Sequence, residues 1–577
     1  MSKSQDAHKS VSIALTGAGG AGVITAGNML LEAAAKSGLY GLFTRSSGPQ
    51  IRGGEAAAMI RLGPKPVDAP GDNFDILIAL DWHNIDRFAI ELPLTPNSLV
   101  VADPAQGDVP DVIKVSGAQI IELPMKDVAK KIKGRPNMIA LGVVATLIGL
   151  PDDVIDDVLE KVLKKRGGDA LEASRAAVAQ GAEISSSYDF ERKLEKADGD
   201  VADRWMISGN EAAGLGAIRG GIRFVAAYPI TPATEILEWI APNLDKVGGA
   251  LVQAEDELAS ISMIIGGSYG GTPSLTATSG PGLALMAESL GLAVASEVPV
   301  VVVDVMRGGP STGIPTKSEQ SDLNIALFGL HGDAPHLVTA PTSISDCLFT
   351  TQWSVHLAEA MQVPAIVLSD QLLGQSKAII DKPADLAFVS QRVVAESGVQ
   401  DYQRYALSEN GVSPMAIPGT PGGQYTADGL EHNERGNPSS QVADHVSQLD
   451  KRQDKITGFD YGDHWAEMEG EGDLAVITWG STSAVVSEAL SELRSKGRNI
   501  RMIAPRLLAP ALPEKMAEAL DGVERALVIE LSHSEQFYRY LKGYFDLPCP
   551  VQSYHRPGPL PFHADELVEQ IEQWSVQ

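Results

Sequence analysis

Short apolar runs alternate along the chain with longer segments in which apolar residues recur at helical spacing. Each run has roughly four to eight residues and ends at glycine, proline or a polar cluster, as buried parallel strands do. Strands that alternate with helices in this way indicate an α/β fold with parallel sheets. The clearest predicted strands are residues 11–16, 76–80, 224–227, 250–253, 274–278, 299–305 and 474–478.

At 577 residues the chain is too long for one domain. The α/β pattern is interrupted by a strongly charged stretch at residues 191–204, and again by a long segment of low apolar content. We therefore predict three α/β domains and one loop-rich linker. Their expected boundaries are residues 1–195, 196–395, 396–465 for the linker, and 466–577.

A glycine-rich turn follows the first predicted strand. Gly17, Gly19 and Gly22 fit the pattern G-x-G-x-x-G and precede an apolar helix, an arrangement that lets a phosphate approach backbone N–H groups. A dinucleotide site also needs an acid about 20 residues further on. The chain instead has a loop with Arg45 and Arg52 there. Three interpretations stay open for the turn: a tight structural turn, an anion site, and an NAD site.

A proline-rich turn and an acidic cluster end two neighbouring strands of the second domain. Residues 228–232 read Tyr-Pro-Ile-Thr-Pro, and two prolines fix the backbone there. Thr234 then stands where a helix N-cap is expected. The next strand leads into Glu255, Asp256 and Glu257. Open α/β sheets bind ligands at such strand ends.

Two more loops end the following strands of this domain. The first is Ser279-Gly280-Pro281-Gly282, and the second runs from Arg307 through glycines and prolines to Lys317. In a parallel sheet all four strand ends lie on one edge. We therefore predict one ligand site from these four loops.

Composition excludes several classes of partner. The formal net charge is -28, which opposes binding to nucleic acid or to an anionic membrane. The two cysteines, Cys347 and Cys549, are too few for an iron–sulfur cluster, which takes about four thiolates. No metal-ligand motif, signal peptide or long apolar span is visible, so we expect a cytoplasmic protein without a metal of its own.

The four loops together resemble the α subunit of 2-oxoacid:ferredoxin oxidoreductases. The carrying motifs are YPITP, EDE, TSGPG and RGGPSTGIPTK, and the first domain, with GAGGAG and SSGPQIRGGE, resembles the γ component of that family. A γ component fused in front of α is typical of enzymes acting on 2-oxoglutarate. The resemblance implies a γ-type domain, a thiamine-diphosphate pyrimidine-binding-type domain, and a transketolase C-terminal-like domain.

The resemblance also implies an activity. It is the coenzyme A-dependent oxidative decarboxylation of 2-oxoglutarate to succinyl-CoA with reduction of ferredoxin, or the reverse carboxylation. One alternative is the same chemistry on pyruvate or a branched-chain 2-oxoacid. A second is an NAD-binding or non-catalytic protein built on the GAGGAG turn.

The same resemblance assigns roles to residues. Glu257 would hydrogen-bond the aminopyrimidine of thiamine diphosphate, with Glu255 and Asp256 as rivals. Thr231 and Arg307 would bind the carboxylate or oxo group of the substrate, although Arg307 also fits an ordinary strand-end ion pair. Further coenzyme contacts are expected from Tyr228, Pro229, Ile230 and Ser279. Weaker candidates for a distal carboxylate or coenzyme A are Arg45, Arg52 and Lys317.

The chain would be incomplete as an enzyme. It lacks the G-D-G…N-N signature for thiamine diphosphate and Mg²⁺. The resemblance assigns the diphosphate, Mg²⁺ and a [4Fe-4S] cluster to a β subunit, in a dimer of αβ heterodimers. The coenzyme would bridge both chains, and ferredoxin, itself usually acidic, would dock on β.

Overall fold

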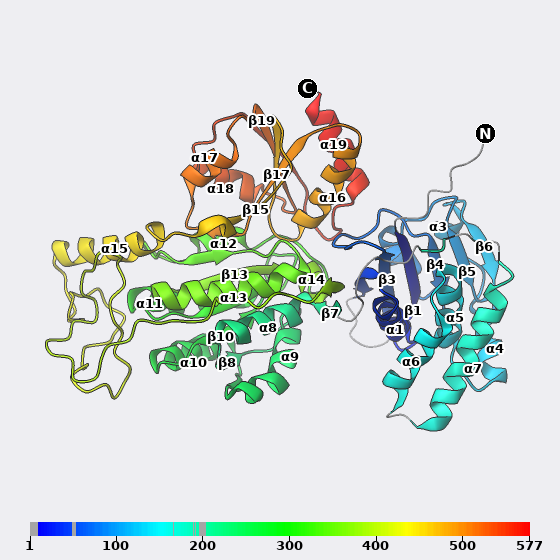
Figure 1. Cartoon of the computed structure of the whole chain (residues 1–577), viewed down its shortest axis with the longest axis horizontal. Coiled ribbons are helices and arrows are strands. Elements are labelled where there is room, and N and C mark those ends of the chain that lie inside the picture. Colours follow the sequence, from blue (N-terminus) through cyan, green and yellow to red (C-terminus); the bar gives the residue numbers. More distant parts are fainter. Residues whose placement is uncertain are drawn as a thin grey trace. The chain divides into compact units, whose positions relative to one another are not determined.

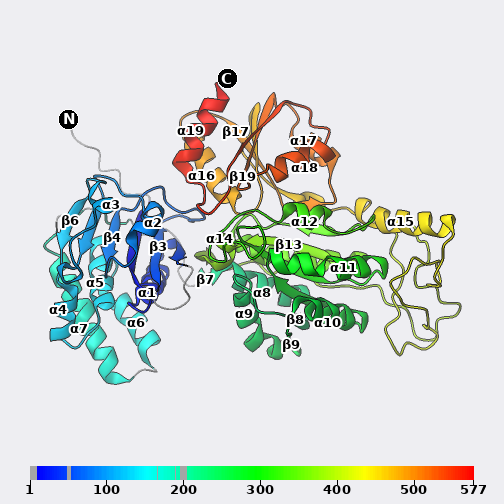
Figure 2. The ribbon, with the colours of Figure 1, turned by 180° about the vertical axis from the view of Figure 1, so that it is seen from behind.

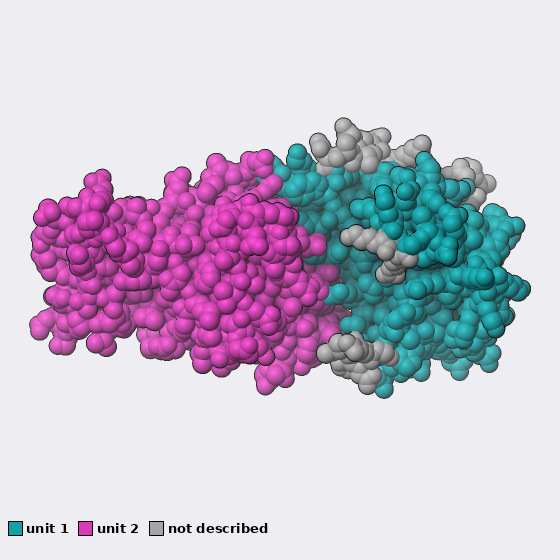
Figure 3. Space-filling view, turned by 90° about the horizontal axis from the view of Figure 1, so that it is seen from below, with its two compact units in different colours: residues 1–208, 376–384, 563–565 teal, residues 209–375, 385–562, 566–577 magenta. Residues whose placement is uncertain are grey.

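The computed structural model describes residues 10–48, 54–164, 167–188, 190, 192–194 and 204–576. The chain forms two compact units, coloured separately in Figure 3. Unit 1 comprises residues 1–208, 376–384 and 563–565, and unit 2 comprises residues 209–375, 385–562 and 566–577. Each unit is described by itself.

Unit 1 contains an eight-stranded sheet in the order β6-β5-β4-β1-β3-β2-β14-β7 (Figure 1). Its strands are β1 (Val11–Ala18), β2 (Tyr40–Ser47), β3 (Glu55–Gly63), β4 (Ile76–Ala79), β5 (Leu99–Ala102), β6 (Gln119–Glu122), β7 (Arg204–Ser208) and β14 (Lys377–Asp381). Its helices are α1 (Val23–Lys36), α2 (Ile85–Phe88), α3 (Asp111–Lys114), α4 (Met125–Lys131), α5 (Pro136–Ile148), α6 (Asp152–Leu163) and α7 (Gly168–Ser185).

The sequence pattern missed β3. This strand pairs antiparallel with both β1 and β2, so it separates two strands that a dinucleotide fold would place side by side. Its alanines and single arginine carry little apolar periodicity, which explains the omission.

The larger sheet of unit 2 has the order β18-β12-β13-β11-β10-β8-β9. All neighbours from β9 to β12 pair in parallel, as predicted for the four strands of the site. Its strands are β8 (Phe224–Ala227), β9 (Ala250–Gln253), β10 (Ser274–Thr278), β11 (Val301–Met306), β12 (Leu337–Thr339), β13 (Ala365–Asp370) and β18 (Leu507–Ala509). Helix α8 packs on α13, and α10 packs on α11. These helices and their neighbours are α8 (Gly209–Gly220), α9 (Thr234–Leu244), α10 (Glu257–Tyr269), α11 (Gly280–Ala295), α12 (Leu323–Phe328), α13 (Ile344–Met361) and α14 (Gln371–Gln375).

A second sheet of unit 2 has the order β15-β17-β16-β19-β20 (Figure 2). Its strands are β15 (Ala466–Glu469), β16 (Leu474–Ile477), β17 (Ile500–Pro505), β19 (Arg525–Glu530) and β20 (Val551–His555), with helices α16 (Thr482–Ser495), α17 (Pro513–Ala519), α18 (Gln536–Tyr544) and α19 (Ala564–Ser575). One continuous apolar core, which includes Trp353 and Trp479, underlies both sheets. The α/β fold class predicted from the sequence is confirmed.

The segment after β14 extends through irregular loops into helix α15 (Val442–Thr457), drawn in yellow in Figure 1. The sequence pattern identified the loops but missed the helix, because α15 is strongly polar. Of its buried residues, several are charged or amide side chains rather than apolar ones. Because α15 is buried through polar contacts, its sequence lacks the apolar periodicity from which a helix is predicted.

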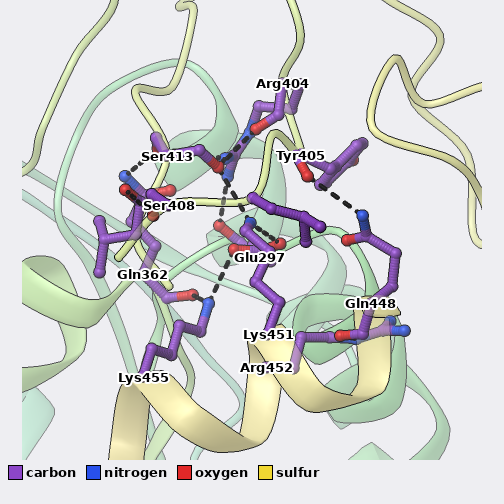
Figure 4. Close-up of polar contacts among 12 residues, drawn as sticks. Glu297, Gln362, Arg404, Tyr405, Ser408, Ser413, Gln448, Lys451, Arg452 and Lys455 are labelled. Carbon is purple, nitrogen blue, oxygen red and sulfur yellow. Dashed lines mark hydrogen bonds and ion pairs between the residues drawn. The ribbon is translucent and has the colours of Figure 1, made fainter. Parts of the chain in front are cut away.

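An ion cluster around Glu297 attaches this segment to the end of α11 (Figure 4). The fully buried Glu297 carboxylate accepts hydrogen bonds from Lys451 Nζ at 2.5 Å and from Lys455 Nζ at 2.8 Å. Arg404, from the loops, donates through Nη2 to the Glu297 carbonyl oxygen at 2.8 Å. Glu297 therefore contacts two different parts of the segment, α15 through its carboxylate and the loops through its backbone carbonyl oxygen.

Burial and charge act in opposite directions on this cluster. Burial alone would raise the pKa of Glu297, but the charges of Lys455 and Lys451 outweigh it and hold that pKa well below the ordinary value. Burial also lowers the pKa of Lys451 to about 8, although Glu297 opposes this shift. Removing the single carboxylate would leave the cations buried without a counter-charge.

Among the described helices, none is both long enough and apolar enough to cross a bilayer.

We predict that Glu297→Gln loosens residues 396–457 while the two sheets stay folded. Breaking a buried ion pair by removing one partner costs about 3–5 kcal/mol. Hydrogen exchange of this segment should therefore accelerate by orders of magnitude. In the wild type, the contribution of Glu297 is full above its ordinary pKa of 4.5 and is lost as pH falls through the lowered folded value.

The matched control is Glu409→Gln, an exposed carboxylate in the same loops. It should leave exchange unchanged. Equal exchange in both variants would show that the cluster does not hold the segment.

Candidate functional site

The candidate site lies at the carboxyl ends of β8, β9, β10 and β11. The turn after β8 presents Tyr228, which is 40% exposed, and an exposed Thr231. Pro229 and Ile230 are half-buried between them. Below the turn, the buried Asn210 amide donates to the Pro232 carbonyl oxygen at 3.0 Å, which fixes the backbone that carries Thr231.

The predicted N-cap at Thr234 is wrong. Thr234 is the first helical residue of α9, and the cap position belongs to Ala233, which has helical backbone angles and no side-chain bond. The Thr234 N–H bonds instead to the Ile230 carbonyl oxygen at 3.0 Å. The proline-rich turn therefore satisfies the helix start with backbone, where the sequence suggested a hydroxyl.

The three consecutive acids after β9 have different surroundings. Glu255 is exposed. Asp256 caps α10, and its Oδ1 accepts from the Ala259 N–H at 2.7 Å. Glu257 lies in the first turn of α10 and is only 8% exposed. Of the three, only Glu257 is a carboxylate enclosed by protein.

Glu257 packs against the first turn of α11 through a glycine. A Cβ atom added at Gly282 would lie 2.0 Å from Thr278 Oγ1 and 2.9 Å from Glu257 Oε1. Ser279 precedes this turn and is fully buried, and its Oγ has no hydrogen-bond partner in the described part of the chain. This turn is therefore preceded by a buried hydroxyl and packs against a buried carboxylate.

Arg307 lies at the end of β11 and is 7% exposed. Its Nη1 donates to the Thr231 carbonyl oxygen at 2.5 Å, so the two residues expected to bind substrate are in direct contact. Two carboxyl groups, Asp304 on β11 and Asp322 beyond the following loop, lie close enough to influence its pKa. Burial lowers the pKa of Arg307 below its ordinary value, although the charges of the two carboxyl groups act in the opposite direction.

Sequence reasoning missed Asp304 and Asp322. Asp304 is fully buried in β11, and burial raises its pKa well above the ordinary value, with the neighbouring Asp322 as the second cause. A signal was present, since Asp304 is the one acid in the apolar run 299–305. An acid inside a strand buried on both faces needs a specific partner.

The remaining candidates are Lys317, Arg45 and Arg52. Lys317 is half-buried where the loop after β11 closes on itself, with the Gly308 N–H bonded to the Lys317 carbonyl oxygen at 3.0 Å. Arg45 is half-buried on β2 in unit 1. Arg52 falls outside the described residues.

Unit 1 has a cavity of about 1280 Å³ beside the glycine-rich turn. Besides Gly19, Gly20 and Gly22, it is lined by Lys126, Lys133 and Arg135, which sequence reasoning did not single out. Lys126 lies in α4, and Lys133 and Arg135 lie between α4 and α5. Only three-dimensional folding brings these cations to the turn. In this sheet β2 is not adjacent to β1, so the strand end that supplies a ribose-binding acid in NAD sites is displaced.

Metal-binding side chains do not cluster in the described residues, where no group of three suitable ligands occurs. Cys347 and Cys549 are both buried and unpaired to each other.

The molecule is an α/β protein with a buried acid and an arginine at the strand ends of a mostly parallel sheet. Comparison with known proteins gives its family. Residues 215–451 match the family "Pyruvate flavodoxin/ferredoxin oxidoreductase, thiamine diP-bdg". Residues 12–184 match the family "Pyruvate ferredoxin/flavodoxin oxidoreductase".

Relatives with curated names agree with these matches. The 2-oxoglutarate synthase subunit KorA of Methanothermobacter marburgensis is 36% identical over 385 residues, covering 64% of this chain and 99% of that protein. The 2-oxoacid:ferredoxin oxidoreductase subunit alpha of Sulfolobus sp is 29% identical over 616 residues, covering 96% and 95%.

A solved structure matches almost the whole chain. It is the 2-oxoglutarate:ferredoxin oxidoreductase from Magnetococcus marinus with 2-oxoglutarate, coenzyme A and succinyl-CoA bound, at 37% identity and TM-score 0.91, covering 98% of this chain and 99% of that one. This chain belongs to the 2-oxoacid:ferredoxin oxidoreductase family, as an α subunit with a γ-type amino-terminal part.

We predict that Gly282→Ala lowers the thermal-unfolding midpoint, because the added methyl group must displace Thr278 or Glu257. Overpacking of this kind costs about 1–3 kcal/mol. The matched control is Gly291→Ala on the same helix, where the nearest atom would be 3.7 Å away.

The control should be neutral or stabilising, since alanine favours a helix over glycine by up to about 1 kcal/mol. If both variants unfolded at the same temperature, the first turn of α11 would have space for a methyl group, which would contradict the close packing at Gly282.

Proposed function

We propose that this chain is the catalytic α subunit of a 2-oxoglutarate:ferredoxin oxidoreductase that works with a β subunit. The observation that supports it most is a chain of neighbours that links Glu257, the first turn of α11, Asp322, Arg307 and Thr231. Gly282 contacts Glu257 there, and Gly280 faces Asp322, which in turn lies near Arg307. An enclosed carboxylate and an enclosed guanidinium at one strand edge suit a coenzyme ring and a substrate carboxylate.

Thiamine diphosphate fits the residues present. The buried Glu257 can hold a hydrogen bond to the aminopyrimidine nitrogen, and Ser279 Oγ is a buried hydroxyl without a hydrogen-bond partner among the described residues. When bound, this coenzyme supplies a carbanion that attacks the oxo group and stabilises the charge left by loss of CO₂. The turn residues Tyr228, Pro229 and Ile230 would support the ring, while the diphosphate and Mg²⁺ would lie on the β subunit.

Arg307 and Thr231 would orient the oxoacid. A guanidinium binds a carboxylate by charge-assisted hydrogen bonds, and Arg307 is pre-positioned by its bond to the Thr231 carbonyl oxygen. The Thr231 side chain is exposed and can donate to the carboxylate or oxo group. Glu257 would hold the proton that the coenzyme ring exchanges, in a site from which the protein excludes most water.

The electrons need a carrier outside this chain. Oxidation of the oxoacid to an acyl-CoA releases CO₂ and two electrons. The electrons would pass one at a time to ferredoxin through a [4Fe-4S] cluster that we expect on the β subunit. Coenzyme A would be the acyl acceptor. Lys317, Arg45 and Arg52 stay candidates for its phosphates or for a distal carboxylate, together with the cations that line the cavity of unit 1.

Relatives favour 2-oxoglutarate over other oxoacids. Of the proteins compared above, those named for 2-oxoglutarate are 36% and 37% identical to this chain, while the one named for 2-oxoacids in general is 29% identical. Pyruvate and branched-chain oxoacids are the alternative substrates.

The first test is reduction of viologen by the purified αβ complex with coenzyme A and each oxoacid in turn. We expect 2-oxoglutarate to give the highest kcat/KM. Preference for pyruvate would change the assigned substrate, and no activity with any 2-oxoacid, or binding of NADH by the chain alone, would overturn the proposal.

In the same complex, Glu257→Gln should lower kcat by about 10²–10⁴, the usual contribution of proton transfer by a positioned side chain. The complex should still assemble, which size-exclusion chromatography measures. Glu255→Gln is the matched control, and it should keep activity because that side chain is exposed. The reverse pattern would move the role to Glu255.

A further inference from the structure

Two carboxyl groups and one guanidinium form a cluster beneath the proposed substrate site. Asp304 comes from β11, Arg307 from the end of the same strand, and Asp322 from the segment just before α12. Asp304 pairs in register with Thr278 of β10, directly before the first turn of α11. A Cβ atom at Gly280, in that turn, would lie 2.6 Å from both carboxyl oxygens of Asp322.

The hydrogen bonds of the two carboxyl groups do not suit two ionised side chains. Neither oxygen of Asp304 has a donor within the described residues, and neither does Asp322 Oδ2, although all three atoms are buried. Asp322 Oδ1 accepts from Ser321 Oγ at 3.0 Å. The two carboxyl groups lie within hydrogen-bond reach of each other, so a proton on one of them supplies the missing donor.

The charged neighbours do not remove this need for a proton. Arg307 faces both carboxyl groups, and Glu319, from the loop, adds a negative charge near Asp322. His533 lies near Glu319. Glu257 reaches the same turn of α11 from α10. Two acids therefore surround the pair besides its one arginine.

Counting charges shows what an anionic substrate would meet. With both acids ionised, the cluster of Asp304, Asp322 and Arg307 carries −1 −1 +1, or −1 in total, which repels a carboxylate. One proton makes it neutral, and two protons leave the full positive charge of Arg307. The pKa values point the same way. Burial raises that of Asp304 well above its ordinary value and that of Asp322 to about 6.

We propose that Asp304 and Asp322 are a proton-sharing pair that positions Arg307 and takes up a proton when an oxoacid carboxylate binds there. This proposal rests on the proposed function, because it assumes that Arg307 receives the substrate. By linkage, a ligand that prefers the protonated pair raises the proton affinity of the pair by the same factor. Above pH about 6, oxoacid binding then consumes up to one proton per site, and KM rises with pH.

The test measures proton uptake directly. The αβ complex carrying Glu257→Gln, in which we expect turnover to be about 10²–10⁴ slower, is titrated with 2-oxoglutarate by calorimetry in two buffers of different ionisation enthalpy. We expect uptake that rises from a fraction of a proton near pH 6 towards one proton near pH 8. Adding Asp322→Asn, which fixes a neutral group of the same shape, should abolish the uptake.

Steady-state kinetics of the complex with Glu257 intact give an independent measure of the coupling between protonation and substrate binding. KM for 2-oxoglutarate should rise about tenfold per pH unit well above the pKa of the pair, while kcat changes little. Asp322→Asn, or Asp304→Asn if the first variant does not fold, should flatten this profile. The matched control Glu319→Gln changes a neighbouring acid and should keep the slope.

Each outcome decides a different claim. Binding without proton uptake in the wild-type pair would overturn the proton-sharing pair and leave the proposed function standing. If proton uptake persisted in Asp322→Asn, the proton would be taken up by another group, and this result would also overturn the proposal. Failure to bind or convert any 2-oxoacid would overturn the proposed function, and this proposal with it.

Discussion

The close packing of the first turn of α11 is the constraint on which the site depends. Gly280 faces Asp322 and Gly282 faces Glu257, in both cases with no room for a Cβ atom. The turn follows β10, in the middle of four parallel strands whose ends supply the other site residues. Because Gly280 and Gly282 have no side chains, the carboxyl groups of Asp322 and Glu257 can both pack against this turn.

Unit 2 contains two kinds of buried polar group: those that are fully paired and hold the structure together, and those at the candidate site that are incompletely paired. Glu297 is held by two lysines at hydrogen-bond distance, and its cluster attaches the loop segment and α15. At the strand ends, the polar atoms of Ser279, Asp304 and Arg307 are buried but incompletely paired within the described residues. Unsatisfied buried groups are unfavourable for folding alone, so a ligand or a proton is the natural partner for them.

The parts that could be predicted from sequence are those with a local cause. Strands β8 to β11 are short runs that end at a proline-rich, acidic or glycine-rich loop, and their parallel orientation follows from the helices between them. β3 and α15 were missed because alanine-rich and charged segments reach burial through neighbours distant in sequence. Among the site residues, Glu257, Thr231 and Arg307 stand in motifs, whereas Asp322 matters only because folding brings it beside Asp304. The roles of all these residues stay predictions.

The most direct test of the central claim is a structure of the αβ complex with thiamine diphosphate and 2-oxoglutarate bound. We expect Glu257 to lie within hydrogen-bond distance of the aminopyrimidine nitrogen and Arg307 to contact the 2-oxoglutarate carboxylate next to the oxo group. We also expect the diphosphate to contact the β subunit. An aminopyrimidine ring that touches no residue of this chain, or that contacts Glu255 instead, would contradict the proposed site.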